Sequence, residues 1–179
     1  MPMTHRRSTV SLGSRVLKVD HAGEFGAIAI YTGQITMARW RARRLVPELV
    51  EFREHERRHR AIFATELARR HVRRCRSYPL CGVGGFCLGI VTGLLGERAI
   101  SATTVAVESV VLRHLEDQAT RLRDVDPEAV EAISRIVDEE RMHHDHAAAH
   151  LAASDPWYRT LRPMVAIATE AVIWLGMKL

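Results

Sequence analysis

The sequence predicts an all-α fold, a four-helix bundle with two additional apolar helices, one at a crossover and one at the C-terminus. Four segments repeat hydrophobic residues at alternating steps of three and four, the period that turns one stripe of a helix toward a core. Two further segments, 79–96 and 157–179, are mostly apolar. The 179 residues are 47% hydrophobic and 26% charged. This composition predicts a single globular domain, residues 14–179.

The first helix is expected over residues 14–43, after a flexible N-terminus formed by residues 1–13. That terminus is basic and rich in hydroxyl groups, so the remnant of an organelle-targeting segment is the alternative for it. The second helix is expected to begin near Pro47, which suits a first helical turn, and to end near Arg74.

Residues 79–96 contain no charged side chain and are just long enough to span a membrane. A single span would place the two halves of the bundle on opposite sides of the membrane. We therefore expect a crossover helix that lies across the bundle or in the membrane interface. Its Gly85, Gly89 and Gly93 permit close helix packing, in lipid or in a core.

The fourth helix is expected over residues 100–122. Asp126-Pro127-Glu128 is a strong start signal for the fifth, with aspartate as the N-cap and proline at the first helical position. This helix is expected to end near Ala153. In the final segment, residues 157–179, Trp157 and Trp174 suit a membrane interface, although core packing explains the segment equally well.

The chain repeats a pattern of glutamate and histidine on these stripes. Glu56-x2-His59 and Glu140-x2-His143 place a carboxylate and an imidazole on one helix face, about one turn apart. A lone glutamate, Glu24 or Glu108, lies 32 residues before each pair, and the second set lies 84 residues after the first.

Two helical hairpins that each supply one Glu and one Glu-x2-His form the ligand set of ferritin-like di-metal carboxylate bundles. An unpaired carboxylate on a buried stripe is costly, so a partner or a metal is expected there. The predicted metal ligands are Glu24, Glu56, His59, Glu108, Glu140 and His143.

Several polar residues beside these ligands fall off the stripes. His144 and Asp145 are expected next to the site or at the surface, and Glu54 and His55 on the exterior. Glu139 lies one residue off its stripe. Asp138 is expected to pair with Arg141 on the outside.

The net charge of +5 makes an acidic partner plausible. The basic run at residues 69–76 lacks an aromatic platform or known motif, which disfavours nucleic acid and favours a solvated or lipid-facing helix end. Cys75, Cys81 and Cys87 match no zinc or disulfide pattern, fit a reducing compartment and receive no assigned role.

Motifs along the chain resemble those of the demethoxyubiquinone hydroxylases, the di-iron monooxygenases of ubiquinone biosynthesis. The resemblance covers nearly the whole chain from about Arg15. It rests on Val19-Asp-His-Ala-Gly-Glu-Phe-Gly26, Ile30-Tyr-Thr-Gly-Gln34, Glu56-x2-His59-x3-Phe63, Leu94-Leu-Gly96, Thr104-Val-Ala-Val-Glu108, Gln118 and Asp138-Glu-Glu-Arg-Met-His-His-Asp145.

This resemblance implies a ferritin-like di-iron domain that binds two Fe ions, with O2 as oxidant and NADH as electron source. It implies the same six ligands that the repeat selects. Tyr31 and His114 are candidates to lie beside those ligands. The chain departs from the family pattern at Phe25, Ser109 and His114-Leu115, none of which is a ligand in the repeat.

The implied reaction is hydroxylation of the ring of demethoxyubiquinone or demethoxyubiquinol. Its partners are a polyprenyl quinone substrate, an anionic membrane surface and accessory proteins of ubiquinone biosynthesis, with no nucleic acid. Peripheral attachment to the cytoplasmic face of a bacterial inner membrane is expected, or to the matrix face of the mitochondrial inner membrane. The alternative is a ferritin-like ferroxidase or iron-binding protein, because the same ligands suit it.

Overall fold

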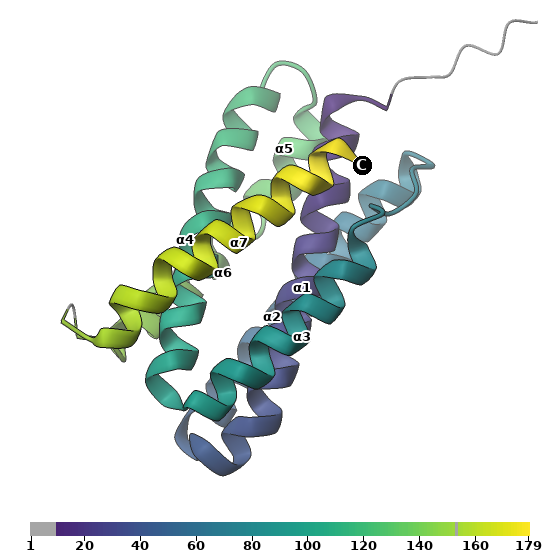
Figure 1. The fold of residues 1–179 in the computed structure, drawn as a ribbon. Coiled ribbons are helices and arrows are strands. Elements are labelled where there is room, and N and C mark those ends of the chain that lie inside the picture. The colour runs from purple at the N-terminus through teal and green to yellow at the C-terminus, as the bar shows by residue number, and fades with distance from the viewer. Residues whose placement is uncertain (1–9, 153) are drawn as a thin grey trace, which may run out of the picture.

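A computed structural model describes residues 10–152 and 154–179. Within these residues the chain is helical with short connections and no strand, and the predicted all-α bundle with two additional apolar helices is confirmed (Figure 1). Most of the expected flexible N-terminus, residues 1–9, lies outside the described residues. The first helix begins at Leu12, where the side chain of Ser11 accepts a hydrogen bond from the Ser14 amide.

The bundle is formed by helices whose hydrophobic stripes meet in two buried clusters. One cluster includes Phe63, Leu122 and Ile133, and the other includes Tyr31 and Phe52. The bundle helices are α1 (Leu12–Arg41), α2 (Val46–Arg69), α4 (Glu97–Leu122) and the pair α5 (Pro127–Ser134) and α6 (Val137–Ala149), with the 3₁₀ turn η1 (Arg43–Leu45) between α1 and α2.

The prediction of one continuous fifth helix from residue 126 to 153 was wrong. The chain breaks at Arg135 and Ile136, so α5 and α6 are separate, and α6 ends at Ala149. Residues 134–136 contain neither glycine nor proline, and Ile136 is fully buried. No local stop signal therefore accounts for the break.

The second helix ends at Arg69, five residues before the expected end. His71 adopts a left-handed φ of 54°, and the Val72 amide donates back to the Leu67 carbonyl, which closes the helix. Arg70 leaves this turn to pair with Asp126, the N-cap of α5, with 2.8 Å between Nη2 and Oδ1. The turn thereby joins the end of α2 to the start of α5.

Helix α3 (Tyr78–Leu95) lies along α1, and the two backbones approach very closely (Figure 1). A Cβ atom at Gly89 would lie 2.1 Å from the Ile30 carbonyl oxygen, and one at Gly85 would lie 2.4 Å from that of Gly26. The glycine series anticipated in either lipid or a core therefore faces α1.

Helix α7 (Pro156–Lys178) packs on α4, on the same face of the molecule as α3 (Figure 1). Both helices are long and apolar enough to cross a membrane, and each packs one side against the bundle. Their outward sides expose large hydrophobic residues. We call these residues the apolar face: Leu80, Val83, Phe86, Val91, Leu94, Leu95, Met164, Ile167 and Trp174.

Candidate metal centre

The six side chains selected by the repeat converge at the centre of the bundle, and none is more than 5% exposed. Their ligand atoms form two groups, in each of which all atoms lie within 4.8 Å of one another. One group is Glu24, Glu56, His59 and Glu140, and the other is Glu56, Glu108, Glu140 and His143. Glu56 and Glu140 belong to both, so they would contribute to both positions if two ions were bound.

Several atoms of this cluster lack the partners that buried polar groups require. Nδ1 of His59 lies 2.8 Å from Oε1 of Glu140, and Nδ1 of His143 lies 3.1 Å from Oε1 of Glu56. None of these four atoms makes a hydrogen bond of acceptable geometry. Four carboxylates and two imidazoles that converge with these unpartnered atoms among them fit a pair of iron ions, since oxygen and imidazole donors suit iron.

The protein environment disfavours negative charge on two of the carboxyls. Burial raises the pKa of Glu24 well above its usual range, and the charges of Glu56 and Glu140 raise it further. Burial likewise raises the pKa of Glu108, with the charges of Glu140 and Glu56 adding to the effect. A positive charge between these side chains would relieve both effects.

For the two histidines, nearby charge has a larger effect on the pKa than burial does. Burial acts to lower the pKa of each, but the nearby carboxylates of Glu140 and Glu56 outweigh it. They raise the pKa to about 10 for His59 and about 11 for His143. Burial acts to raise the pKa of Glu56, but contacts from His143 and His59 lower it below its usual range. A metal ion bound to His59 or His143 would displace the proton that these carboxylates favour on the imidazole.

Two residues that sequence reasoning placed away from the site contact the histidines directly. His55, expected on the exterior, is buried, with its Nδ1 3.0 Å from Nε2 of His143. Glu139, expected off the stripe, places Oε2 2.9 Å from Nε2 of His59. Such contacts to the second ring nitrogen fix the orientation of a metal-binding imidazole.

The repeat itself carried the signal for these two residues. His55 and Glu139 are also 84 residues apart, and each directly precedes one of the shared glutamates. The contacts are reciprocal, since each residue reaches the histidine of the other hairpin.

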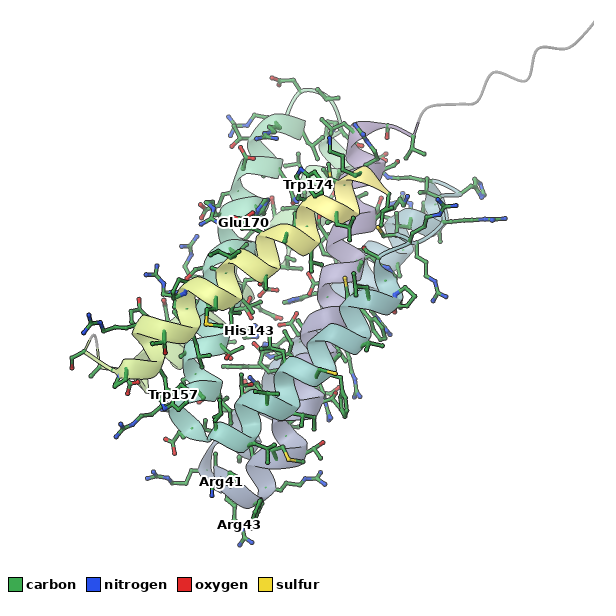
Figure 2. All side chains as sticks on the ribbon, in the orientation of Figure 1. Arg41, Arg43, His143, Trp157, Glu170 and Trp174 are labelled. Atoms are coloured by element: carbon green, nitrogen blue, oxygen red, sulfur yellow. The ribbon has the colours of Figure 1, made fainter. Side chains whose placement is uncertain are left out.

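Tyr31 lies beside the cluster, and its buried hydroxyl donates to Oε1 of Glu108 at 2.9 Å. Phe52 packs between Tyr31 and His143, with its ring centroid 4.3 Å from that of His143. Figure 2 shows His143 in the interior of the bundle, whereas Glu170 and Trp174 lie on α7. His114 contacts Glu170, 2.8 Å from its Oε2.

A cavity of about 320 Å³ leads from the cluster toward the surface between α3 and α7. Glu24, Glu56, Glu108 and Glu140 line its inner part. Most other lining side chains are apolar, and they come from α1, α3, α4 and α7. Such a space suits an apolar molecule with a few polar groups.

A family model described as "Ubiquinone biosynthesis protein COQ7" matches residues 11–176. The chain belongs to this family. A relative from Dictyostelium discoideum is 36% identical over 168 residues, which cover 92% of this chain and 76% of the relative. A relative from Homo sapiens is 35% identical over 169 residues, 92% of this chain and 77% of the relative. Both are named "NADPH-dependent 3-demethoxyubiquinone 3-hydroxylase, mitochondrial".

A bacterial relative from Rhodospirillum rubrum is 35% identical over 169 residues, which cover 94% of this chain and 79% of the relative. It is named "3-demethoxyubiquinol 3-hydroxylase". The resemblance drawn from the motifs is therefore confirmed at the level of the COQ7 family.

Phe25 and Ser109, two of the positions expected to depart from the family pattern, have defined surroundings here. The Phe25 ring stacks on Tyr78, with 4.1 Å between centroids. The Ser109 hydroxyl donates to the Val105 carbonyl at 2.6 Å, within its own helix.

Arg141 was expected to pair with Asp138. Its side chain instead pairs with Glu116.

Replacement of His143 by alanine is expected to remove most of the iron from the purified protein, whereas His144→Ala should retain it. The two side chains point about 100° apart around α6. His143 lies in the cluster, and His144 contacts Asp145 near the surface, 2.9 Å from its Oδ1. The measurement is iron content per chain. Equal iron loss in the two variants would place the ligand register one residue away.

Proposed function

We propose that the chain is a 3-demethoxyubiquinol 3-hydroxylase-type monooxygenase of ubiquinone biosynthesis. The main support for this proposal is the site itself. Two overlapping ligand groups share Glu56 and Glu140, and they lie at the inner end of an apolar cavity. The printed names of the relatives support the same reaction. The alternative of a ferroxidase does not account for the apolar cavity.

In this proposal Glu24, Glu56, His59, Glu108, Glu140 and His143 hold two iron ions, which supply the capacity to reduce and activate O2. One oxygen atom enters the ring, and the other leaves as water after uptake of two electrons and two protons. Glu56 and Glu140 would each contribute to both metal positions, and His55 and Glu139 would hold the two imidazoles in place. Tyr31 holds Glu108 in one orientation through its hydroxyl.

The resemblance implied NADH as electron source, but the names of the mitochondrial relatives specify NADPH. We therefore propose NADPH as the donor in place of NADH.

The apolar lining of the cavity excludes water from the ring during reaction. A polyprenyl tail would leave between α3 and α7 toward the apolar face.

Mass analysis of cellular quinones tests the function. Cells that lack the gene should accumulate the demethoxy precursor and lose ubiquinone, and the wild-type gene should restore the product. A Glu56→Ala gene should not. A quinone profile unchanged by deletion of the gene would contradict the proposed reaction.

We also propose peripheral membrane attachment through the apolar face, at the cytoplasmic face of a bacterial inner membrane or the matrix face of the mitochondrial inner membrane. Relatives of both origins are known. Arg73 and Arg76, exposed just before α3, would each contribute about 1 kcal/mol near anionic lipid. Accessory proteins of ubiquinone biosynthesis remain proposed partners, and nucleic acid is not expected.

Flotation with liposomes is expected to show binding that rises with anionic lipid and falls with salt. Val83 and Ile167, 67% and 69% exposed on the apolar face, are the side chains to change. The variant Val83→Glu/Ile167→Glu should lose most binding, because it places two charges where apolar area meets lipid. Val125→Glu is the matched control, since Val125 is 70% exposed in the loop between α4 and α5. Equal flotation of the double variant and wild type would contradict this face, and resistance to carbonate would indicate a span.

A further inference from the structure

We propose that a groove between α4 and α7 binds the phosphate group of a lipid. This groove and the cavity that leads to the glutamates share none of their described lining residues. The inference rests on the proposed attachment of the apolar face to a membrane. It adds to that attachment a chemical preference among anionic lipids.

The groove has a volume of about 480 Å³, and its walls come from both helices. Three of its lining side chains are arginines, Arg113 on α4 and Arg159 and Arg162 on α7. None of the described side chains that line it is acidic. Three cations around one groove repel one another, and an anion between them would relieve that repulsion.

Two of these arginines are available to a ligand. The two carboxylates on α7 and at its N-cap, Glu170 and Asp155, pair with other basic side chains. Glu170 partly offsets the charge of Arg113. Within residues 10–152 and 154–179, no carboxylate pairs with Arg159 or Arg162. Both side chains are exposed, so their donors can reach a ligand in the groove.

The Tyr158 ring supports the guanidinium of Arg162 beside the groove. The guanidinium carbon lies 5.3 Å from the ring centroid, and Tyr158 also lines the groove. The N–H groups of a guanidinium lie in its plane and match the oxygens of a phosphate in pairs. A phosphate monoester offers three acceptor oxygens, so it can bind more than one arginine at once. A carboxylate offers only two, so the groove favours a phosphate.

The position of the groove favours a phosphate that belongs to a lipid. Arg159, Pro163 and Ile167 follow one another at steps of four along α7, so they form one row on the helix surface. The first two line the groove, and Ile167 belongs to the apolar face. Along α7 the groove begins just after Trp157, which is labelled in Figure 2. With the apolar face against hydrocarbon, the groove lies at the level of the lipid phosphates, where basic pockets bind head groups.

Flotation of the full-length protein with two kinds of vesicle tests this inference. Both contain phosphatidylcholine and have the same measured surface potential, which phosphatidic acid supplies in one and oleate in the other. The general attraction of basic residues to the surface is then equal, so a difference in binding reports recognition of phosphate rather than carboxylate. The wild-type protein should bind the phosphatidic acid vesicles about tenfold more tightly.

The variant Arg159→Gln/Arg162→Gln should lose most of this preference, because it removes both available guanidinium groups and keeps good helix formers. The matched control is Arg123→Gln/Arg135→Gln. It removes the same charge from two exposed positions next to the ends of α4 and α5, outside the groove. The preference should persist in the control. Helix content and turnover of a short-tailed quinone analogue should be unchanged in both variants.

Equal binding of the wild-type protein to the two kinds of vesicle would overturn the inference and leave membrane attachment standing. Inorganic phosphate, titrated without vesicles, is the second probe. Saturable binding of it alongside equal vesicle binding would show that the groove takes free phosphate instead of a lipid. An unchanged preference in Arg159→Gln/Arg162→Gln would also overturn the inference. Failure to float with either kind of vesicle would instead contradict the proposed attachment.

Discussion

Replacement of Glu140 by alanine is expected to abolish hydroxylation while the protein remains helical. Glu140 belongs to both ligand groups and is 1% exposed, so its loss removes an oxygen from both proposed metal positions. Changes to residues that merely orient metal ligands cost about 10–100-fold, so the loss here should exceed about 100-fold. Turnover, iron content and circular dichroism are measured on the same preparation.

The fold is expected to survive because the bundle helices are held together by two apolar clusters that do not include Glu140. Loss of Glu140 takes a charged partner from His59, but it also reduces the mutual repulsion of the four carboxyls gathered in the core. Glu54→Ala is the matched control, because Glu54 is an exposed glutamate on α2 that pairs with Arg57 outside the cluster. Normal turnover in Glu140→Ala with full iron occupancy would contradict the ligand assignment.

Replacement of Gly89 by alanine is expected to destabilise the protein, whereas the same change at Gly84 should not. A Cβ at Gly89 would lie 2.1 Å from the Ile30 carbonyl oxygen, so α3 must move away from α1. Overpacking of this kind costs about 1–3 kcal/mol, and alanine recovers up to about 1 kcal/mol of helix propensity. A net loss of about 2 kcal/mol corresponds to a fall in Tm of roughly 4–8 °C.

Gly84 is a strict control because it lies on the same helix with nothing within 4 Å of its Cβ position. Alanine there should raise the free energy of unfolding by about 0.5–1 kcal/mol through helix propensity alone. Thermal unfolding followed by circular dichroism measures both variants. Similar melting temperatures for the two would show that α3 does not pack on α1 as described.

The helices and the central cluster could be predicted because both depend on periodicity. A hydrophobic stripe fixes which side of a helix is buried, and a pattern repeated at 84 residues identifies the polar side chains on that stripe. The six clustered side chains were named from this pattern alone. Their convergence in space agrees with it.

The helix ends and the neighbours of the cluster could not be predicted in the same way. The turn after α2 depends on His71 in a left-handed conformation, inside an arginine-rich run that carries no glycine. The break before α6 has no glycine or proline to announce it in residues 134–136. His55 was assigned to the exterior, and Glu139 was placed one residue off its stripe. Both side chains reach across to the opposite hairpin.

The reciprocal contacts of His55 and Glu139 constrain when the site can form during synthesis of the chain. The N-terminal hairpin emerges from the ribosome with Glu24, Glu56 and His59, but Glu139, the partner of His59, is made much later. Glu140 and His143 follow immediately after it. Neither proposed metal position has its complete set of side chains until α6 has been translated and packed, so iron would enter the proposed site only after that point.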